Sequence, residues 1–444
     1  MEAFHSQIGI PFPYGFPTTV MNIRSRTSSS ANHILSSSTW RMDSRVWSRL
    51  PHKLIDRIIA FLPPPAFFRS RSVCKRWYSL LFSSKFLELY LQVSPHCHWF
   101  IFFKHKSLKT YISHSSNRDD GSERETYEGY LLDPQTLTWY RFSFPFVPTG
   151  FYPATSSGGL IGWVSYEAGS KNILLCNPLI GSPSLVPIAP TLRPRLFPSI
   201  GSNITSSSID LVVAGDDLTS PYAVKNLTTE SFHVDTNGFY SIWGTTSALP
   251  RLCSFESGNM VFAGGRFYCM NSSPFSVLFY GISSNTWCKI QPPMRRFLRS
   301  PSLVESGGRL IMVAAVEKSK LNVPRSLRMW ALQDCGTTWA EIERMPQQLY
   351  VQFTGMENGK GFNCVGHGNF VVITIKNSDK AMLYEFKSKK WVWVPHCPFV
   401  HQVSSSRGGG GAGGGGGVEL HGFAYEPRLA TPVTALLDQL TLPF

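Results

Sequence analysis

The fold is decided by the stretch AGGRFYCMNSSPFSVLFYGISSNTWCKIQPPM (263–294). It opens with Gly-Gly, which suits a tight turn between two strands. An apolar segment, a polar loop and a second apolar segment follow, and a short polar turn leads to Trp287, which opens a last strand. This order predicts the turn-linked strands of one small antiparallel sheet.

The same order recurs twice further along the chain. One copy is SGGRLIMVAAVEKSKLNVPRSLRMWALQDCGTTWAEIERMP (306–346), and the other is HGNFVVITIKNSDKAMLYEFKSKKWVWVPHCP (367–398), with Gly-Asn in place of Gly-Gly. A tryptophan marks each copy at a spacing of 52 residues, and an earlier one lies 148 residues before Trp287, close to three periods: Trp287, Trp339, Trp391 and Trp139. A period of about 50 residues with these marks is typical of a kelch-type β-propeller.

The number of blades follows from the weaker copies and the chain ends. Residues 157–187 and 208–234 keep the strands but lose the tryptophan, which makes six copies in all. The first copy has no inner strand before HCHWFIFFK (96–104), whereas VELHGFAYEP (418–427) is a strand without a blade. We therefore expect this strand to close the ring by completing the first blade, so that stacking buries both faces of every blade. A seven-bladed ring is the alternative, because residues 232–254 are long enough to hold further strands.

A helical unit precedes the predicted propeller. In RLPHKLIDRIIAFLPPP (49–65) apolar residues recur at helical spacing, and Pro63–Pro65 are expected to end the helix because they lack the amide that the next turn requires. Three stripes indicate three short helices: Leu54, Ile55, Ile58, Ile59 and Leu62; Val73, Cys74, Trp77, Leu80 and Leu81; Phe86, Leu87, Tyr90 and Leu91. A unit of this size is marginal alone. Its apolar stripes therefore predict a partner that covers them.

The domain plan follows from these patterns. Residues 1–42 are rich in Ser, Thr and Pro and are expected to be a disordered leader. The helical unit takes 43–92, and the propeller takes 93–429, including a disordered Gly-rich loop at 404–417 that leads into the closing strand. Residues 430–444 form a tail. The fold class is mainly β.

Composition agrees with this plan and narrows the function. Charged residues make up 16% of the chain, and Lys plus Arg exceed Asp plus Glu by 42 to 28, which gives a net charge of +14. Such an excess favours acidic partners, either nucleic acid or an acidic protein surface. Nine cysteines occur singly without C-x-x-C, which favours buried reduced thiols over disulfides or a zinc ribbon. Without a signal-peptide pattern or a run of about 20 apolar residues, we expect a soluble intracellular protein.

Basic residues gather in loops that the propeller brings to one side. If each blade runs from strand A inside to strand D outside, the D-to-A and B-to-C loops share a face. That face would hold MRRFLRS (294–300) and EKSKLNVPR (317–325), with Arg295, Arg296, Arg299, Lys318, Lys320 and Arg325. KHKSLK (104–109) and Arg193 and Arg195 map there too, whereas residues 121–250 carry more acids than bases. We hypothesise that this basic face lies near nucleic acid or an acidic partner; a merely solvated surface is the alternative.

No pattern of residues predicts catalysis. The chain contains no G-x-S-x-G, P-loop or H-E-x-x-H motif. HCH (96–98) has no second ligand pair at a useful spacing, so no metal site is predicted, and no cofactor is expected. Cys74 falls in an apolar stripe, which favours packing over a nucleophilic role.

The helical unit, LPHKLIDRIIAFLPPPAFFRSRSVCKRWYSLLFSSKFLELYL (50–91), resembles an F-box in its Leu-Pro start, its Leu/Ile/Leu spacing and its VCKRW…LL close. The resemblance implies docking onto a Skp-type adaptor of a cullin-RING ubiquitin ligase. The implied contacts are Leu50, Pro51, Leu54, Ile55, Ile58, Leu62, Val73, Cys74 and Trp77. PPPAFF departs from the acidic or small polar residues that many F-boxes carry there.

The whole chain, including GFAYEPRLATPV (422–433), is similar to plant F-box proteins of the Fimbriata / Unusual Floral Organs type. The resemblance implies a non-catalytic ligase subunit, nuclear and also cytoplasmic, that recognises substrates and acts with a LEAFY-type transcription factor in floral meristem and organ identity. The alternative is a ligase-independent transcriptional cofactor whose propeller bridges a DNA-binding factor to DNA. The identity and fate of the target stay open, as does the oligomeric state.

Overall fold

A computed structural model describes residues 44–104, 127–165, 171–180, 183–186, 198–205, 207–217, 226–235, 243–250, 253, 259–272, 275–317, 325–400 and 418–431. The predicted leader, the Gly-rich loop and most of the tail lie outside these residues. Within them, no helix is both long and apolar enough to cross a membrane.

The F-box region is a set of short helices. They are α1 (Ser44–Arg49), α2 (His52–Ala60), α3 (Pro64–Ser70), α4 (Lys75–Ser79), the 3₁₀ turn η1 (Leu80–Phe82) and α5 (Ser84–Val93). The prediction that Pro63–Pro65 only end a helix was incomplete. They also start α3, because Pro64 and Pro65 occupy its first positions, where an amide is not needed.

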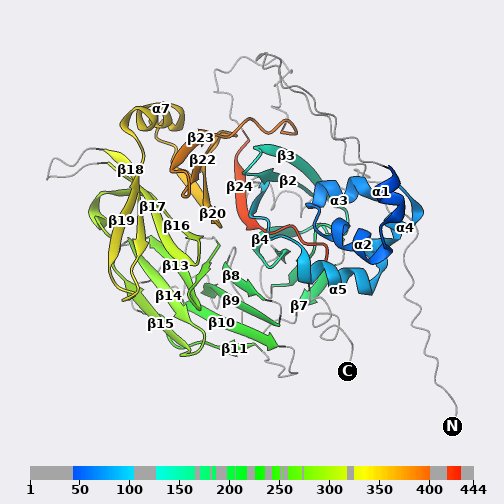
Figure 1. Ribbon diagram of the computed structural model, residues 1–444. Coiled ribbons are helices and arrows are strands. Elements are labelled where there is room, and N and C mark those ends of the chain that lie inside the picture. Colours follow the sequence, from blue (N-terminus) through cyan, green and yellow to red (C-terminus); the bar gives the residue numbers. More distant parts are fainter. Residues whose placement is uncertain are drawn as a thin grey trace, which may run out of the picture. The chain divides into compact units, whose positions relative to one another are not determined.

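The rest of the described chain forms six four-stranded antiparallel sheets arranged as a propeller (Figure 1). Blade 1 contains β24 (Leu420–Tyr425), β1 (Trp99–Lys104), β2 (Tyr127–Asp133) and β3 (Thr138–Phe144). Blade 2 contains β4 (Phe151–Ser157), β5 (Leu160–Ser165), β6 (Ile173–Cys176) and β7 (Pro183–Val186). Blade 3 contains β8 (Ser199–Ile204), β9 (Ser208–Asp217), β10 (Asn226–Asp235) and β11 (Gly244–Thr245).

Blade 4 contains β12 (Val261–Ala263), β13 (Arg266–Ser272), β14 (Phe275–Gly281) and β15 (Thr286–Ile290). Blade 5 contains β16 (Leu298–Ser306), β17 (Arg309–Val316), β18 (Ser326–Leu332) and β19 (Trp339–Arg344). Blade 6 contains β20 (Phe362–His367), β21 (Phe370–Ile375), β22 (Ala381–Glu385) and β23 (Lys390–Trp393). A 3₁₀ turn, η2 (Arg295–Phe297), precedes blade 5, and the helix α7 (Gln347–Glu357) lies between blades 5 and 6.

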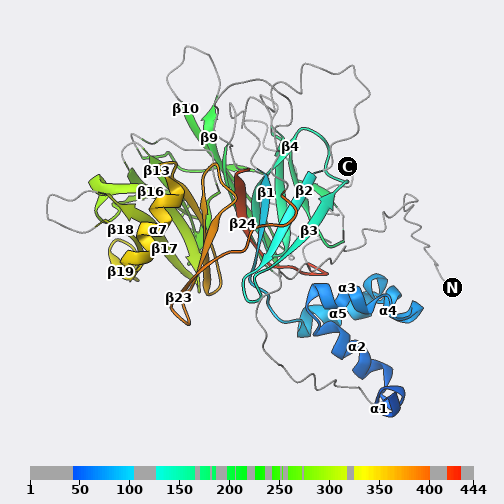
Figure 2. The ribbon, with the colours of Figure 1, turned by 90° about the horizontal axis from the view of Figure 1, so that it is seen from above.

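The C-terminal strand closes the ring, as the sequence predicted. β24 pairs antiparallel with β1 along its whole length, from Leu420 opposite Lys104 to Tyr425 opposite Trp99. Figure 2 shows β24, in red, beside β1. Each innermost strand also contacts that of the next blade, ending with β20 against β24. This closure leaves no open sheet edge at the join.

The conserved order of turn and tryptophan has a structural cause. The first turn of blades 2, 4 and 5 is a Gly-Gly pair in which both residues have positive φ, as a tight hairpin requires: Gly158 and Gly159, Gly264 and Gly265, Gly307 and Gly308. The tryptophan on the outer strand reaches back to the preceding blade. The indole of Trp339 donates to the Gln291 carbonyl at 3.1 Å, and that of Trp139 donates to the Pro395 carbonyl at 2.8 Å.

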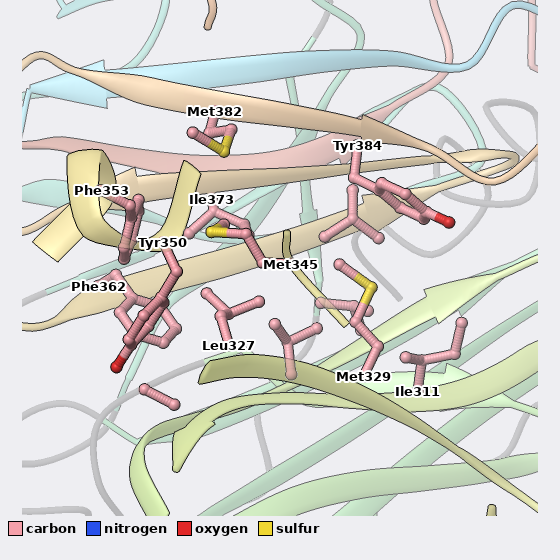
Figure 3. Close-up of a cluster of buried hydrophobic side chains, with 14 of the residues drawn as sticks. Ile311, Leu327, Met329, Met345, Tyr350, Phe353, Phe362, Ile373, Met382 and Tyr384 are labelled. Atoms are coloured by element: carbon pink, nitrogen blue, oxygen red, sulfur yellow. The ribbon is translucent and has the colours of Figure 1, made fainter. Parts of the chain in front are cut away.

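The interface between blades 5 and 6 is one continuous apolar core. It includes Leu327 and Met329 from β18 together with Ile373 and Phe362 from blade 6. Figure 3 shows Tyr350 and Phe353 of α7 among these side chains. The helix thus belongs to the core of the propeller, although its sequence lies outside the blade repeat and was not predicted.

Candidate docking surfaces

The helix α2 has two apolar sides, and only one of them is buried by this chain. Ile55 and Ile59 point inward and are 9% and 2% exposed. Leu54, Ile58 and Phe61 follow one another at a spacing of four and three residues and are 44%, 36% and 49% exposed. Helical residues so spaced share a face.

The inward side of the helices forms the small core of the F-box region. Ile59, Phe67, Phe86 and Tyr90 are large buried members of this core, and the Phe67 and Phe86 rings stack with centroids 5.8 Å apart. The core extends to Leu179 and Leu429, which follow the ends of β6 and β24. The F-box region therefore packs on the side of the propeller where the A-to-B and C-to-D turns lie.

The outward side gathers the exposed apolar residues. We call Leu54, Ile58, Phe61 and Val73 the F-box face; Val73 is 64% exposed. Of the other predicted adaptor contacts, Pro51 and Cys74 are exposed, and Leu50, Leu62 and Trp77 are half-buried. Ile55 is the exception, because it is buried in the F-box core. Exposed apolar surface of this kind marks sites where another protein binds.

Two exposed aromatic residues of the F-box region, Tyr78 and Phe82, and the half-buried Arg71 between them were missed by sequence reasoning. The Arg71 guanidinium lies 4.5 Å from the Tyr78 ring centroid and 5.7 Å from that of Phe82. Both rings are 55% exposed. Only the spacing of Tyr78 and Phe82, four residues apart, hinted that they share a surface.

The basic face is only partly described. The Glu317 amide donates to the Phe297 carbonyl at 3.1 Å, which joins the start of the B-to-C loop of blade 5 to the turn before that blade. Arg296 and Arg325 are exposed, and Arg295 is half-buried. Lys318, Lys320, Lys106, Lys109, Arg193 and Arg195 lie outside the described residues.

Arg299 differs from the other predicted basic residues, because this chain neutralises it. Its guanidinium forms ion pairs with Glu317 and with Glu357, whose side chain is 1% exposed. Burial alone would raise the pKa of the Glu357 carboxyl, but hydrogen bonds from Arg299 and the Gly361 amide outweigh burial and lower its pKa. We assign Arg299 a structural role in fixing α7.

Several described histidines and Cys74 make contacts within the fold. His96 Nδ1 lies 2.5 Å from Glu426 Oε1, and the His98 ring packs against His367 with centroids 4.8 Å apart. No group of three His, Cys, Asp or Glu residues suited to a metal ion occurs among the residues that the structure describes. Cys74 caps α4, where its Sγ accepts from the Trp77 amide at 3.5 Å.

The expectation of buried thiols holds for only part of the set. All nine cysteines are free, and the exposed ones are Cys74, Cys288 and Cys335. Cys335 lies in the turn between β18 and β19, where hydrogen bonds with the hydroxyl and amide groups of Thr338 and Thr337 lower the pKa of its thiol to about 6. Polar turn residues, rather than an apolar stripe, surround this cysteine.

Comparison with known proteins adds two family matches and several close relatives. The F-box domain family matches residues 47–89, and the KIB1-4 beta-propeller family matches residues 131–364. Protein UNUSUAL FLORAL ORGANS of Arabidopsis thaliana is 62% identical over 411 residues, which cover 92% of this chain and 91% of that protein. Protein ABERRANT PANICLE ORGANIZATION 1 of Oryza sativa subsp. indica is 42% identical over 425 residues, which cover 89% of this chain and 92% of that protein. SKP1-interacting partner 15 of Arabidopsis thaliana is 24% identical over 388 residues, which cover 80% of this chain and 95% of that protein.

Proposed function

Because the chain belongs to the family of F-box proteins that carry a KIB1-4 beta-propeller, we propose that it is the substrate-recognition subunit of a Skp-cullin-F-box ubiquitin ligase. We further propose that it acts with a LEAFY-type transcription factor, in the nucleus, in floral meristem and organ identity. The close relatives named for floral organs and panicle organisation support this role.

The observation that carries the proposal is the F-box face. Four large apolar side chains stand exposed on a unit whose inward side is already filled. Burying apolar surface contributes roughly 25 cal/mol per Å², so covering this face with an adaptor stabilises the complex. The F-box domain implies a Skp1-type adaptor as the protein that covers it.

The arrangement favours a mechanism by proximity. The F-box region packs on the side of the propeller where the A-to-B and C-to-D turns lie. The basic loops and α7 lie at the opposite ends of the strands, where the D-to-A and B-to-C loops lie. An adaptor on one side therefore leaves the other side free for a target. Holding a target near a ubiquitin carrier raises its effective concentration, and this chain itself performs no bond chemistry in the proposed role.

Adaptor binding tests the first half of the proposal. The double variant Leu54→Glu/Ile58→Glu places two charges on the F-box face without touching the inward side of α2. We expect at least a 100-fold loss of affinity for a purified Skp-type adaptor, measured by calorimetry, with an unchanged melting temperature. The control Gln135→Glu/Lys387→Gln makes the same change in net charge in two distant turns. Equal affinity of both variants for the adaptor would overturn the proposal.

The described arginines of the basic face support the second candidate, a cofactor that bridges a DNA-binding factor to DNA. Arg295 and Arg296 belong to the turn before blade 5, and Arg325 ends the neighbouring loop. The variant Arg295→Glu/Arg296→Glu should abolish the supershift of a LEAFY-type factor on DNA and spare adaptor binding. Deleting 43–92 separates the two functions, because target-gene activation that survives the deletion makes the ligase role secondary.

A further inference from the structure

The outward side of α7 is the second exposed apolar surface of the described chain. Eight large apolar side chains are exposed among the described residues. Six of them lie between Leu54 and Phe82 in the F-box region, and the remaining two, Val351 and Met356, both lie on α7 with exposures of 60% and 45%. The rest of the described propeller has no such side chain.

The outward residues of α7 form one uncharged stripe. They follow helical spacing, and we call them the α7 stripe: Gln348, Val351, Gln352, Gly355 and Met356. A helix side that faces only water usually carries charged residues. The one charged residue of this helix, Glu357, is instead buried against Arg299.

The other side of α7 is held firmly. Phe353 and Tyr350 are 0% and 5% exposed, and both lie in the apolar core between blades 5 and 6 (Figure 3). The ion pair of Glu357 with Arg299 fixes the C-terminal end. The stripe is therefore presented on a rigid support, which lowers the entropic cost of binding a partner.

Gly355 has no explanation in the packing of this chain. A Cβ atom built there has nothing within 4 Å, and no positive φ requires glycine. Glycine inside a helix destabilises the helix relative to alanine. Its place between Val351 and Met356 lets another backbone approach the helix closely.

Basic residues border the α7 stripe. Lys380 Nζ lies 2.8 Å from Met356 Sδ, and Lys360 is exposed just beyond the helix end. The Lys376 amide donates to the Gly361 carbonyl at 3.0 Å, which places this residue beside Lys360.

The acids near this border are already engaged. Glu317 pairs with Arg299, Asp379 lies 2.8 Å from His396 with its side chain 10% exposed, and Glu419 accepts from the Asn377 amide at 3.2 Å. Two of these carboxylates, Asp379 and Glu419, keep their charge beside the lysines. Among the residues that the structure describes, however, Lys360, Lys376 and Lys380 form no ion pair, so their ammonium groups are available to a partner at the edge of the apolar centre.

We propose that the α7 stripe is the docking site for a target-protein segment whose apolar side chains are flanked by carboxylates. The apolar side chains cover Val351 and Met356, the segment's backbone approaches at Gly355, and the carboxylates meet the basic border. The phosphates of a nucleic acid could pair with the basic border, but its charged backbone would then cover the apolar side chains of Val351 and Met356. This assignment rests on the proposed function, in which the propeller holds a target.

The test uses the full chain in complex with its Skp-type adaptor and fluorescence anisotropy with synthetic probes. The first probe is a helical peptide with a leucine stripe flanked by glutamates. The second has lysines for the glutamates, the third has serines for the leucines, and the fourth is a DNA duplex. We expect the first peptide to bind at least about tenfold more tightly than the other two peptides.

Variants tie the binding to the stripe. Val351→Glu/Met356→Glu and, separately, Gly355→Gln should each weaken binding of the first peptide at least about tenfold. Gln135→Glu/Lys387→Gln is again the charge-matched control and should leave it unchanged. Gly355→Gln replaces glycine by a good helix former, so a loss of binding at this position reports on docking and not on folding.

Each outcome decides the assignment. Preference for the acidic apolar peptide, lost in the two stripe variants, supports it. Equal affinity for the three peptides, unchanged binding in both variants, or a site that takes DNA in preference to the first peptide overturns it. Adaptor binding is read separately, so a complex that forms but takes no peptide refutes only this inference. A chain that binds the peptide but no adaptor refutes only the ligase role.

Discussion

The helices α2 and α7 both show apolar side chains to solvent, but their surroundings differ. α2 belongs to a small helical unit with a modest core, and its outward side carries Leu54, Ile58 and Phe61. α7 rests on the core between two blades and carries only Val351 and Met356 outward, with Gly355 between them. The larger surface predicts a stable partner, and the smaller one predicts a target that binds and leaves.

The comparison of α2 with α7 predicts the largest loss of stability when an inward-facing side chain of either region is truncated. Phe353→Ala should lower the free energy of unfolding by about 3–5 kcal/mol, and Ile59→Ala by about 2–5 kcal/mol, because both side chains are fully packed. Val351→Ala and Ile58→Ala should stay within about 0.5 kcal/mol of the parent. Chemical denaturation followed by circular dichroism measures all four. Similar losses for inward and outward residues would refute the division into two sides.

The buried ion pair under α7 should come next. Glu357→Gln leaves Arg299 with Glu317 as its partner and should cost about 3 kcal/mol. The pKa of Glu357 is lower in the folded chain, so its contribution is present above the unfolded value of about 4.3 and is lost as the pH falls through the folded value. The gap between parent and variant should therefore be constant near neutral pH and shrink in acid. A gap that widens in acid contradicts the pairing.

A single outward truncation on the F-box face should have a smaller effect, confined to binding. Ile58→Ala removes part of the exposed stripe and should weaken adaptor binding about tenfold, as surface plasmon resonance can measure. Lys53→Ala, an exposed change on the same helix, serves as the control. Unchanged affinity in Ile58→Ala would remove this residue from the predicted contacts.

The smallest effect is expected at Gly355. Gly355→Ala should raise the free energy of unfolding by roughly 0.5–1 kcal/mol, because alanine favours the helix and its Cβ meets nothing. Differential scanning calorimetry of the full chain measures the shift. A lower melting temperature would show that glycine serves the fold itself, and the argument for close approach at this position would fail.

The sequence predicted the propeller well because the blades repeat. Outer tryptophans such as Trp139 and Trp339 bond to the preceding blade in different parts of the ring, so their spacing predicts the fold. The strand at 418–427 pairs with the first blade, which lacked an inner strand. The helix α7 could not be found in this way. It interrupts the repeat once, and its inward residues Tyr350, Phe353 and Glu357 include a buried carboxylate that looks like a surface residue until Arg299 is placed beside it.

The two surfaces were predictable to different degrees for the same reason. The F-box stripe lies on one short helix, so its spacing predicted a single apolar stripe. Spacing did not show that Ile55 and Ile59 face inward while Leu54 and Ile58 face outward. The basic face depended on loop positions, and within the described residues only the contact between Glu317 and Phe297 bears on them, so its role stays a prediction. The role of Arg299 was not visible, because its partner Glu357 lies 58 residues away in the sequence.

One measurement tests the central claim, that the chain has two independent docking surfaces. Adaptor affinity and acidic-peptide affinity are determined by calorimetry for the parent, for Leu54→Glu/Ile58→Glu and for Val351→Glu/Met356→Glu. We predict that the first variant loses only the adaptor and the second loses only the peptide, each with the other affinity unchanged. Variants that lose both ligands together, or neither, would contradict the account.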